Sequence, residues 1–129
     1  FVLRLGGIYG PERHLLADKV KNGTTMDGNA GRILNLIHRD DAVSAILSCL
    51  LAGEKNLGRV YNLTDGSPSA RGERVEWLAN RLEVSPAAFS EDDKEDTPNR
   101  KISSQRIMKE LDWSPKFSSF IKGYESLLG

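Results

Sequence analysis

A run of glycines near the start of the chain is the stretch whose residue types could best support chemistry. Residues 4–11 read R-L-G-G-I-Y-G-P and follow the apolar residues 1–3, which are typical of a short buried strand. Residues without Cβ atoms at the end of a parallel strand expose backbone, and this is where α/β enzymes bring a cofactor close to the chain. The glycines therefore predict either an approach for a cofactor or a tight strand-to-helix turn with no ligand.

The glycine run lacks the spacing of a pyrophosphate-binding turn. Such a turn reads G-x-G-x-x-G between a strand and a helix, but Leu5 stands where the first glycine belongs. Pro11 also lacks the backbone N–H that a phosphate group would use. The run is therefore not predicted to be the phosphate-binding turn of a Rossmann fold.

Three further stretches combine residue types that occur at binding sites: N-L-I-H-R-D-D at 35–41, R-V-Y-N-L at 59–63, and R-K-I-S-S at 100–104 with L-D-W-S-P at 111–115. Asp41 is expected to cap a helix and to pair with Arg4, because arginine and carboxylate form bidentate hydrogen bonds. His38 is expected to be a packing residue more often than a ligand contact, although histidine titrates near neutral pH. Arg100 and Lys101 are either an anion site or a solvated basic pair.

In their order, these motifs resemble the C-terminal part of the extended short-chain dehydrogenases/reductases, the NAD-dependent epimerase/dehydratase family. The glycine run is similar to the strand and loop that follow the catalytic Tyr-x-x-x-Lys of that family. The other stretches are similar to its N-x-I-H-x-D-D, G-x-x-Y-N-[LV] and L-G-W-x-P segments. The resemblance implies that the backbone of Gly7 and Ile8 approaches the nicotinamide and that Tyr9 and Pro11 shape the substrate pocket.

The resemblance also implies that Arg100 and Lys101 meet the phosphates of a sugar nucleotide, and that Asn62 orders the pocket wall. The chain departs from the family pattern at two positions. Asp112 stands where the family has the glycine of L-G-W-x-P, which leaves the phosphate role untouched. Gly7 stands where many sugar-nucleotide enzymes have asparagine, so a related hydroxyl or carbonyl compound stays open as the substrate.

The catalytic pair of this enzyme class is missing from the chain. Hydride-transferring enzymes of this kind use a tyrosine as acid and base beside a lysine, but none of the three tyrosines is followed by x-x-x-Lys. The 129 residues are therefore expected to be inactive alone, with no catalytic or metal site. NAD or NADP is expected in the full-length enzyme and not to bind tightly to this segment.

The composition excludes several other classes of protein. The chain has 18 basic and 18 acidic side chains, so its charge favours neither a nucleic-acid nor a membrane partner. A single cysteine, Cys49, cannot form an internal disulfide, which favours a reducing compartment and hence a cytoplasmic protein. In its apolar surroundings Cys49 is expected to be an unreactive core thiol.

The elements expected to position these motifs alternate between strands and helices. Strands are predicted at residues 1–8, 32–37 and 59–64, and helices at residues 13–21, from Asp40 or Asp41 to Gly53, at 72–83, after Ser103 or Ser104, and from 117. In the second helix, apolar residues at i, i+3, i+4 and i+7 predict a stripe packed on one face: Val43, Ile46, Leu47 and Leu50. The polar stretch 90–99 is predicted to be a mobile surface loop.

The resemblance implies an α/β fold in which residues 1–8 and 59–64 are terminal strands of a Rossmann-type parallel sheet. The rest would form a small, mainly helical substrate-binding lobe. Since the chain opens with Phe1 inside a strand, we expect residues 1–129 to be one C-terminal segment of a longer enzyme. Its expected partner is the upstream half of the same chain, or a second copy that covers the apolar faces. The alternative is a stand-alone, non-catalytic α/β binding or assembly module.

Overall fold

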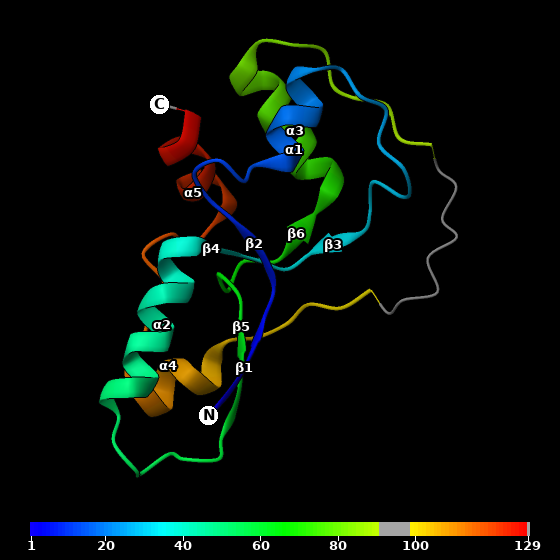
Figure 1. The fold of residues 1–129 in the computed structure, drawn as a ribbon. Coiled ribbons are helices and arrows are strands. Elements are labelled where there is room, and N and C mark those ends of the chain that lie inside the picture. The colour runs from blue at the N-terminus through cyan, green and yellow to red at the C-terminus, as the bar shows by residue number, and fades with distance from the viewer. Residues whose placement is uncertain (91–98, 129) are drawn as a thin grey trace. The chain divides into compact units, whose positions relative to one another are not determined.

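The computed structural model describes residues 1–90 and 99–128 and divides the chain into two compact units (Figure 1). Unit 1 is made of Phe1–Arg13, Asn35–Pro68 and Ile102–Gly129, and unit 2 of His14–Leu34 and Ser69–Lys101. The predicted loop at residues 90–99 lies almost wholly outside the described residues.

Unit 1 combines small parallel sheets with helices. Its elements are β1 (Val2–Leu5), β2 (Gly7–Tyr9), β4 (Leu36–His38), α2 (Arg39–Leu51), β5 (Val60–Leu63), α4 (Gln105–Leu111) and α5 (Phe120–Leu128). β1 pairs in parallel with β5, and β2 pairs in parallel with β4. Figure 1 shows α2 running alongside the β1–β5 pair, so this part of unit 1 has the strand–helix–strand layout expected for a parallel sheet.

The strand predicted over residues 1–8 is divided at Gly6. The backbone N–H of Gly6 donates to Leu63 O at 2.8 Å, and the N–H of Gly7 donates to Asn35 O at 2.9 Å, so the chain leaves β5 and joins β4. A Cβ at Gly6 would collide with the backbone carbonyl of Asn35, and a Cβ at Gly7 would lie 2.6 Å from Leu36 Cδ2. Glycine is therefore required at Gly6 because the backbone of Asn35, next to β4, approaches closely, while Gly7 itself stays exposed. The approach of a cofactor to Gly7 and Ile8 stays a prediction.

The strand predicted at residues 32–37 is two strands that belong to different units. β3 (Ile33–Leu34) pairs antiparallel with β6 (Ser69–Ala70) in unit 2, and β4 belongs to unit 1. Asn35 separates them, because its side-chain oxygen accepts from Ile102 N at 2.8 Å while its carbonyl accepts from Gly7 N. Both bonds come from residues distant in the sequence, so apolar periodicity alone did not reveal the break.

Unit 2 packs α1 (Leu15–Lys21) and α3 (Arg71–Leu82) together with the β3–β6 pair. α3 buries Val75 and Leu78, as its apolar stripe predicts. Arg74 is fully buried on the same helix; its Nε donates to Ser69 Oγ at 2.7 Å and its Nη2 to Leu34 O at 3.3 Å. These bonds fix α3 to both strands of unit 2.

The packing of α2 is the reverse of the prediction. Its buried residues are small, and they lie in the core of unit 1 with side chains of β4, β5 and α4: Ala42, Ala45 and Cys49. The predicted stripe of larger apolar residues faces outward instead. Small side chains let a helix approach a sheet closely, and close packing decides which face is inside. No helix within residues 1–90 and 99–128 is long and apolar enough to cross a membrane.

Candidate functional site

Tyr9 and His38, two of the residues that the sequence singled out, lie at the carboxyl ends of parallel strands in unit 1. β2 ends at Tyr9, β4 ends at His38, and Thr64 and Asp65 follow β5. In parallel sheets, ligands bind outside these ends of the strands. This edge of unit 1 is therefore the candidate site.

Tyr9 is enclosed at this edge and not turned outward. Its ring meets the rings of His38 and Tyr124 edge-on, with centroid distances of 5.3 and 5.4 Å. Its hydroxyl lies against Gly123, where a Cβ would collide with it. The ring of Tyr9 thus holds α5 in unit 1, whereas Pro11 is exposed. The role of both residues in a substrate pocket stays a prediction.

His38 is the residue that caps α2, which corrects the expectation that Asp40 or Asp41 does so. Its Nδ1 accepts a hydrogen bond from Asp40 N at 3.0 Å, and its ring lies 4.1 Å from that of Phe117. Burial lowers the pKa of His38, although Asp40 and Asp41 act to raise it. The imidazole is thereby favoured in its neutral form, which can accept the capping hydrogen bond.

Asp41 is a buried clamp for the segment that precedes α5. Its Oδ1 accepts from Lys116 N at 2.7 Å and its Oδ2 accepts from Phe117 N at 3.0 Å. The predicted ion pair with Arg4 is therefore wrong within the part of the chain that the structure describes, where Arg4 is exposed and Asp41 is buried. A carboxylate that accepts two backbone N–H groups compensates for its own burial.

Two more hydrogen bonds hold the same segment. Trp113 Nε1 donates to Ser44 Oγ at 2.9 Å, and Ser67 Oγ donates to Ser118 O at 2.6 Å. The stretch between α4 and α5 is thus tied to α2 and to the turn after β5. The L-D-W-S-P and N-x-I-H-x-D-D motifs, which are distant in the sequence, are joined here by structural contacts.

A buried hydroxyl pair ties the end of β5 to the start of α4. Thr64 N donates to Ser104 Oγ at 2.7 Å, and Ser104 Oγ donates to Thr64 O at 3.0 Å. The Thr64 hydroxyl donates to Ile102 O at 3.1 Å. Ser104 therefore does not cap α4 with its side chain, and Ser103 supplies the local bond by accepting from Gln105 N at 3.2 Å.

The remaining predicted residues of unit 1 are exposed. Gly7 and Ile8 lie on β2, and Arg4 and Asn62 face each other in the β1–β5 register. Among the described residues, the side chain of Asn62 makes no hydrogen bond, and its role in ordering a pocket wall stays a prediction. These four positions leave backbone and polar side chains accessible on the strands.

Arg100 and Lys101 belong to unit 2, where both are exposed. The side chain of Asn99 accepts a hydrogen bond from the first residue of β3 at 2.8 Å, which places Arg100 beside that strand. Arg71 N donates to Arg32 O at 2.8 Å next to the same strand. Arg32 and Arg71 were not singled out by the sequence, because only the β3–β6 pairing brings their backbones together. The guanidinium of Arg71 donates to Asp27 O and lies 5.5 Å from the centre of the Phe89 ring.

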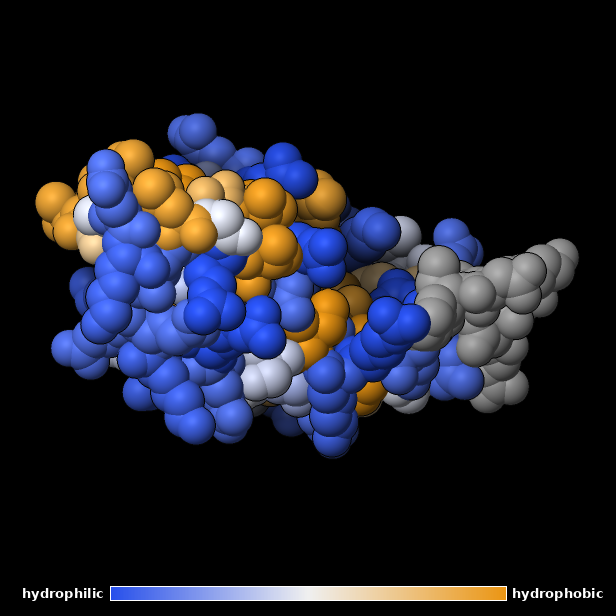
Figure 2. All heavy atoms as spheres, turned by 90° about the horizontal axis from the view of Figure 1, so that it is seen from below, coloured by the Kyte–Doolittle hydropathy of each residue, from blue (hydrophilic) through white to orange (hydrophobic). Residues whose placement is uncertain are grey.

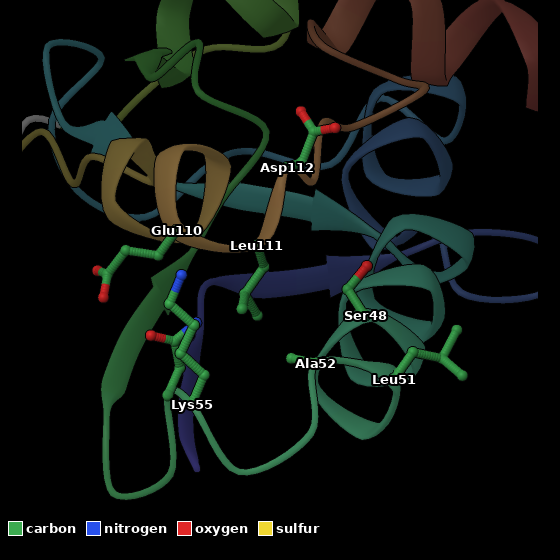
Figure 3. A pocket seen from close by; sticks show the side chains of 8 residues that line it. Ser48, Leu51, Ala52, Lys55, Glu110, Leu111 and Asp112 are labelled. Atoms are coloured by element: carbon green, nitrogen blue, oxygen red, sulfur yellow. The ribbon is translucent and has the colours of Figure 1, made fainter.

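A pocket of about 420 Å³ lies elsewhere in unit 1, between the end of α2 and α4 (Figure 3). Leu111 points into it, whereas Leu51 points away. The end of α2 precedes the amino end of β5, so the pocket is at the opposite end of the strands from Tyr9. It contains none of the predicted site residues. Within residues 1–90 and 99–128, no group of His, Cys, Asp or Glu is arranged to hold a metal ion.

Comparison with known proteins identifies the fold. No protein-family model and no curated protein matches the chain. Among solved structures, UDP-glucose 4-epimerase from Thermotoga maritima with UDP-glucose matches 98% of this chain with 20% identity and a TM-score of 0.81. UDP-glucuronic acid 4-epimerase from Bacillus cereus, in complex with UDP-glucuronic acid and NAD, matches 97% with 18% identity and a TM-score of 0.82. A Methylobacillus flagellatus protein provisionally assigned as an NAD-dependent epimerase/dehydratase matches 98% with 27% identity and a TM-score of 0.78.

The chain spans less than half the length of these proteins: 44% of the Thermotoga enzyme, 42% of the Bacillus enzyme and 45% of the Methylobacillus protein. Its mixed α/β fold with small parallel sheets matches the C-terminal region of Rossmann-type epimerase folds. The expected α/β class is thereby confirmed.

Proposed function

We propose that this chain is the C-terminal portion of an NAD(P)-dependent epimerase, dehydratase or reductase that acts on a sugar nucleotide or a related hydroxyl or carbonyl compound. The observation that carries the proposal is the overlap of nearly the whole chain with less than half of such enzymes, 98% against 44% for the Thermotoga epimerase. The chemistry would be hydride transfer at a hydroxyl carbon. The tyrosine and lysine that this chemistry requires would come from an upstream Rossmann half.

In the proposal, unit 1 completes the sheet that carries the cofactor. β1 and β5 are parallel neighbours and α2 directly precedes β5, as a crossover helix does in a Rossmann sheet. The exposed backbone of Gly7 and Ile8 would approach the nicotinamide of NAD or NADP, which when bound accepts and returns the hydride. The described residues fit only that end of the cofactor, because the glycine run packs against β4 and offers no pyrophosphate turn.

Unit 2 would recognise the phosphate groups of the substrate. Arg100 and Lys101 are exposed, and the β3–β6 pairing brings the backbone of Arg32 and Arg71 to the same strand. Arginine binds phosphate oxygens through two parallel hydrogen bonds, so the exposed side chain of Arg100 suits a phosphate group. Pro11 would add an apolar contact to the pocket, and Tyr9 would hold the backbone that carries Pro11.

The test uses the complete reading frame and the 129-residue chain in parallel. The complete protein should bind NAD(P)H and convert a UDP-sugar. In it, Arg100→Ala should raise the KM about tenfold or more with little change in kcat, because a charge-assisted hydrogen bond is lost. Lys19→Ala, which removes an exposed cation from α1, is the matched control and should leave the KM unchanged.

Two results would contradict the proposal. A complete protein that binds neither NAD(P)H nor any UDP-sugar is not an enzyme of this class. Tight NAD(P)H binding by the 129-residue chain alone would show that the cofactor site is built from these residues, which the missing phosphate turn argues against.

A further inference from the structure

The outward face of α2 carries large apolar side chains that unit 1 leaves uncovered. Their exposed fractions are 51% for Val43, 44% for Ile46, 52% for Leu47, 74% for Leu50 and 84% for Leu51. Residues 42–53 include no charged side chain. Figure 2 shows hydrophobic residues gathered at the upper left of the view. An apolar patch of this kind marks an interaction surface.

The sheet beside α2 is open as well. Within the described part of the chain β1 pairs with β5 alone, and Val2 and Leu5 on β1 are about half exposed, at 52% and 40%. Parallel strands are normally buried on both faces, and an uncovered edge leaves a row of unpaired backbone N–H and C=O groups. The open edge of β1 therefore calls for a further parallel strand.

Chain handedness determines where the connection from such a strand would run. α2 lies on the connection into β5 and covers the face of the sheet that carries Tyr61 and Leu63. Connections between parallel strands are almost always right-handed. A strand on the open edge of β1, joined to β1 in the same direction, would therefore place its helix on that same face, beside α2.

We propose that a helix from an upstream half of the same polypeptide packs on the outward face of α2. This is the helix that leads into β1. This inference rests on the proposed function, which supplies that half. The occupant is an amphipathic helix whose apolar stripe covers Val43, Leu47 and Leu50, followed by the chain that enters β1. A second copy related by a two-fold axis would present its β1 antiparallel and could not continue the parallel sheet.

The test compares the labelling of single introduced thiols in the 129-residue chain and in the complete protein. Leu47→Cys and Leu50→Cys probe the face of α2, and Leu15→Cys on α1, where Leu15 is 69% exposed, is the control. The native Cys49 stays in place, because it is buried and burial raises the pKa of its thiol. Circular dichroism confirms that each variant is folded.

In the 129-residue chain all three variants should react rapidly with a maleimide. In the complete protein, Leu47→Cys and Leu50→Cys should react at least about tenfold more slowly, since a covered thiol reacts only when the covering layer opens. Leu15→Cys should react at the same rate in both. Binding of NAD(P)H, measured on the same samples, reports on the proposed function separately.

Unchanged labelling at both α2 positions in a complete protein that binds NAD(P)H overturns this inference and leaves the proposed function standing. Protection of α2 without NAD(P)H binding supports the inference and counts against the proposed cofactor. Protection that appears in the 129-residue chain and grows with its concentration assigns the face to a second copy and overturns the inference. A reading frame with no upstream α/β half overturns both.

Discussion

The two long helices, α2 in unit 1 and α3 in unit 2, are alike in length and opposite in construction. α3 buries Val75 and Leu78 and exposes the charged residues Glu73 and Glu76. α2 buries small residues and exposes large apolar ones. A helix with one apolar side is completed by a single neighbour, whereas a helix that is apolar all round is normally enclosed between layers. Unit 2 thus completes its own helix, and unit 1 leaves α2 with a face for another layer.

The largest expected effect separates the two helices directly. Leu78→Ala in α3 should lower the free energy of unfolding of unit 2 by about 2–5 kcal/mol, because it leaves a cavity in a fully buried site. Leu47→Ala in α2 should change that of unit 1 by less than about 0.5 kcal/mol, because the side chain is half exposed. Urea unfolding followed by Trp77 in unit 2 and Trp113 in unit 1 measures both. Equal losses would show that α2 is covered in the isolated chain.

The next effect tests the inner face of α2. Asp41→Ala should destabilise unit 1 by about 2–3 kcal/mol, because it removes the acceptor of two backbone N–H groups from a buried site. The neighbouring Asp40 is exposed, so Asp40→Ala should cost less than about 1 kcal/mol, mainly through the helix dipole. Unfolding followed by Trp113 distinguishes the two. A loss of stability no larger for Asp41→Ala than for Asp40→Ala would show that the two hydrogen bonds of Asp41 do not stabilise unit 1.

A pH dependence should appear in both units. Burial lowers the pKa of His38 in unit 1 and of His14 in unit 2. The unfolded chain then binds protons more readily than the folded one, so stability should fall as the pH drops from about 7 to about 5. Each histidine caps its helix by accepting a backbone hydrogen bond, and asparagine can do the same. His38→Asn should reduce the change of the urea midpoint of unit 1 with pH over this range. His14→Asn should do the same for unit 2. A urea midpoint that depends on pH as strongly in the variants as in the original chain would contradict this.

The smallest effect concerns the helix ends. Glu83 caps the C-terminal end of α3 with φ of 57° and Asp112 that of α4 with φ of 52°, a left-handed backbone that favours glycine. Glu83→Gly and Asp112→Gly should each raise the unfolding free energy by up to about 1 kcal/mol. The gain should be larger for Glu83, because aspartate tolerates this conformation better than glutamate. Glu76→Gly inside α3 is the control and should destabilise by about 1 kcal/mol. Stabilisation by Glu76→Gly would refute the argument.

The positions of most elements could be predicted from local signals. Apolar runs located β1 and β5, and the stripe with Val75 and Leu78 located α3, because these signals act within one element. The candidate site was predicted less well. The partners of Asp41 are 75 and 76 residues away in the sequence. The pairing that joins the backbones of Arg32 and Arg71 depends on two strands of two residues each. The apolar periodicity of a sequence carries no information on contacts between such distant residues.

The amino-acid sequence by itself determined the approximate places of the helices and of β1 and β5, that no Tyr-x-x-x-Lys occurs in these 129 residues, and that α2 carries an apolar stripe. Tertiary structure decided which face of α2 is buried, that residues 32–37 divide between two units, and that Asp41 holds the segment before α5. The reason is that backbone preference and capping act over a few residues, whereas burial depends on which surfaces meet. Ala42 and Ala45 allow α2 to pack closely in the core beside β4, so the stripe of larger residues stays outside.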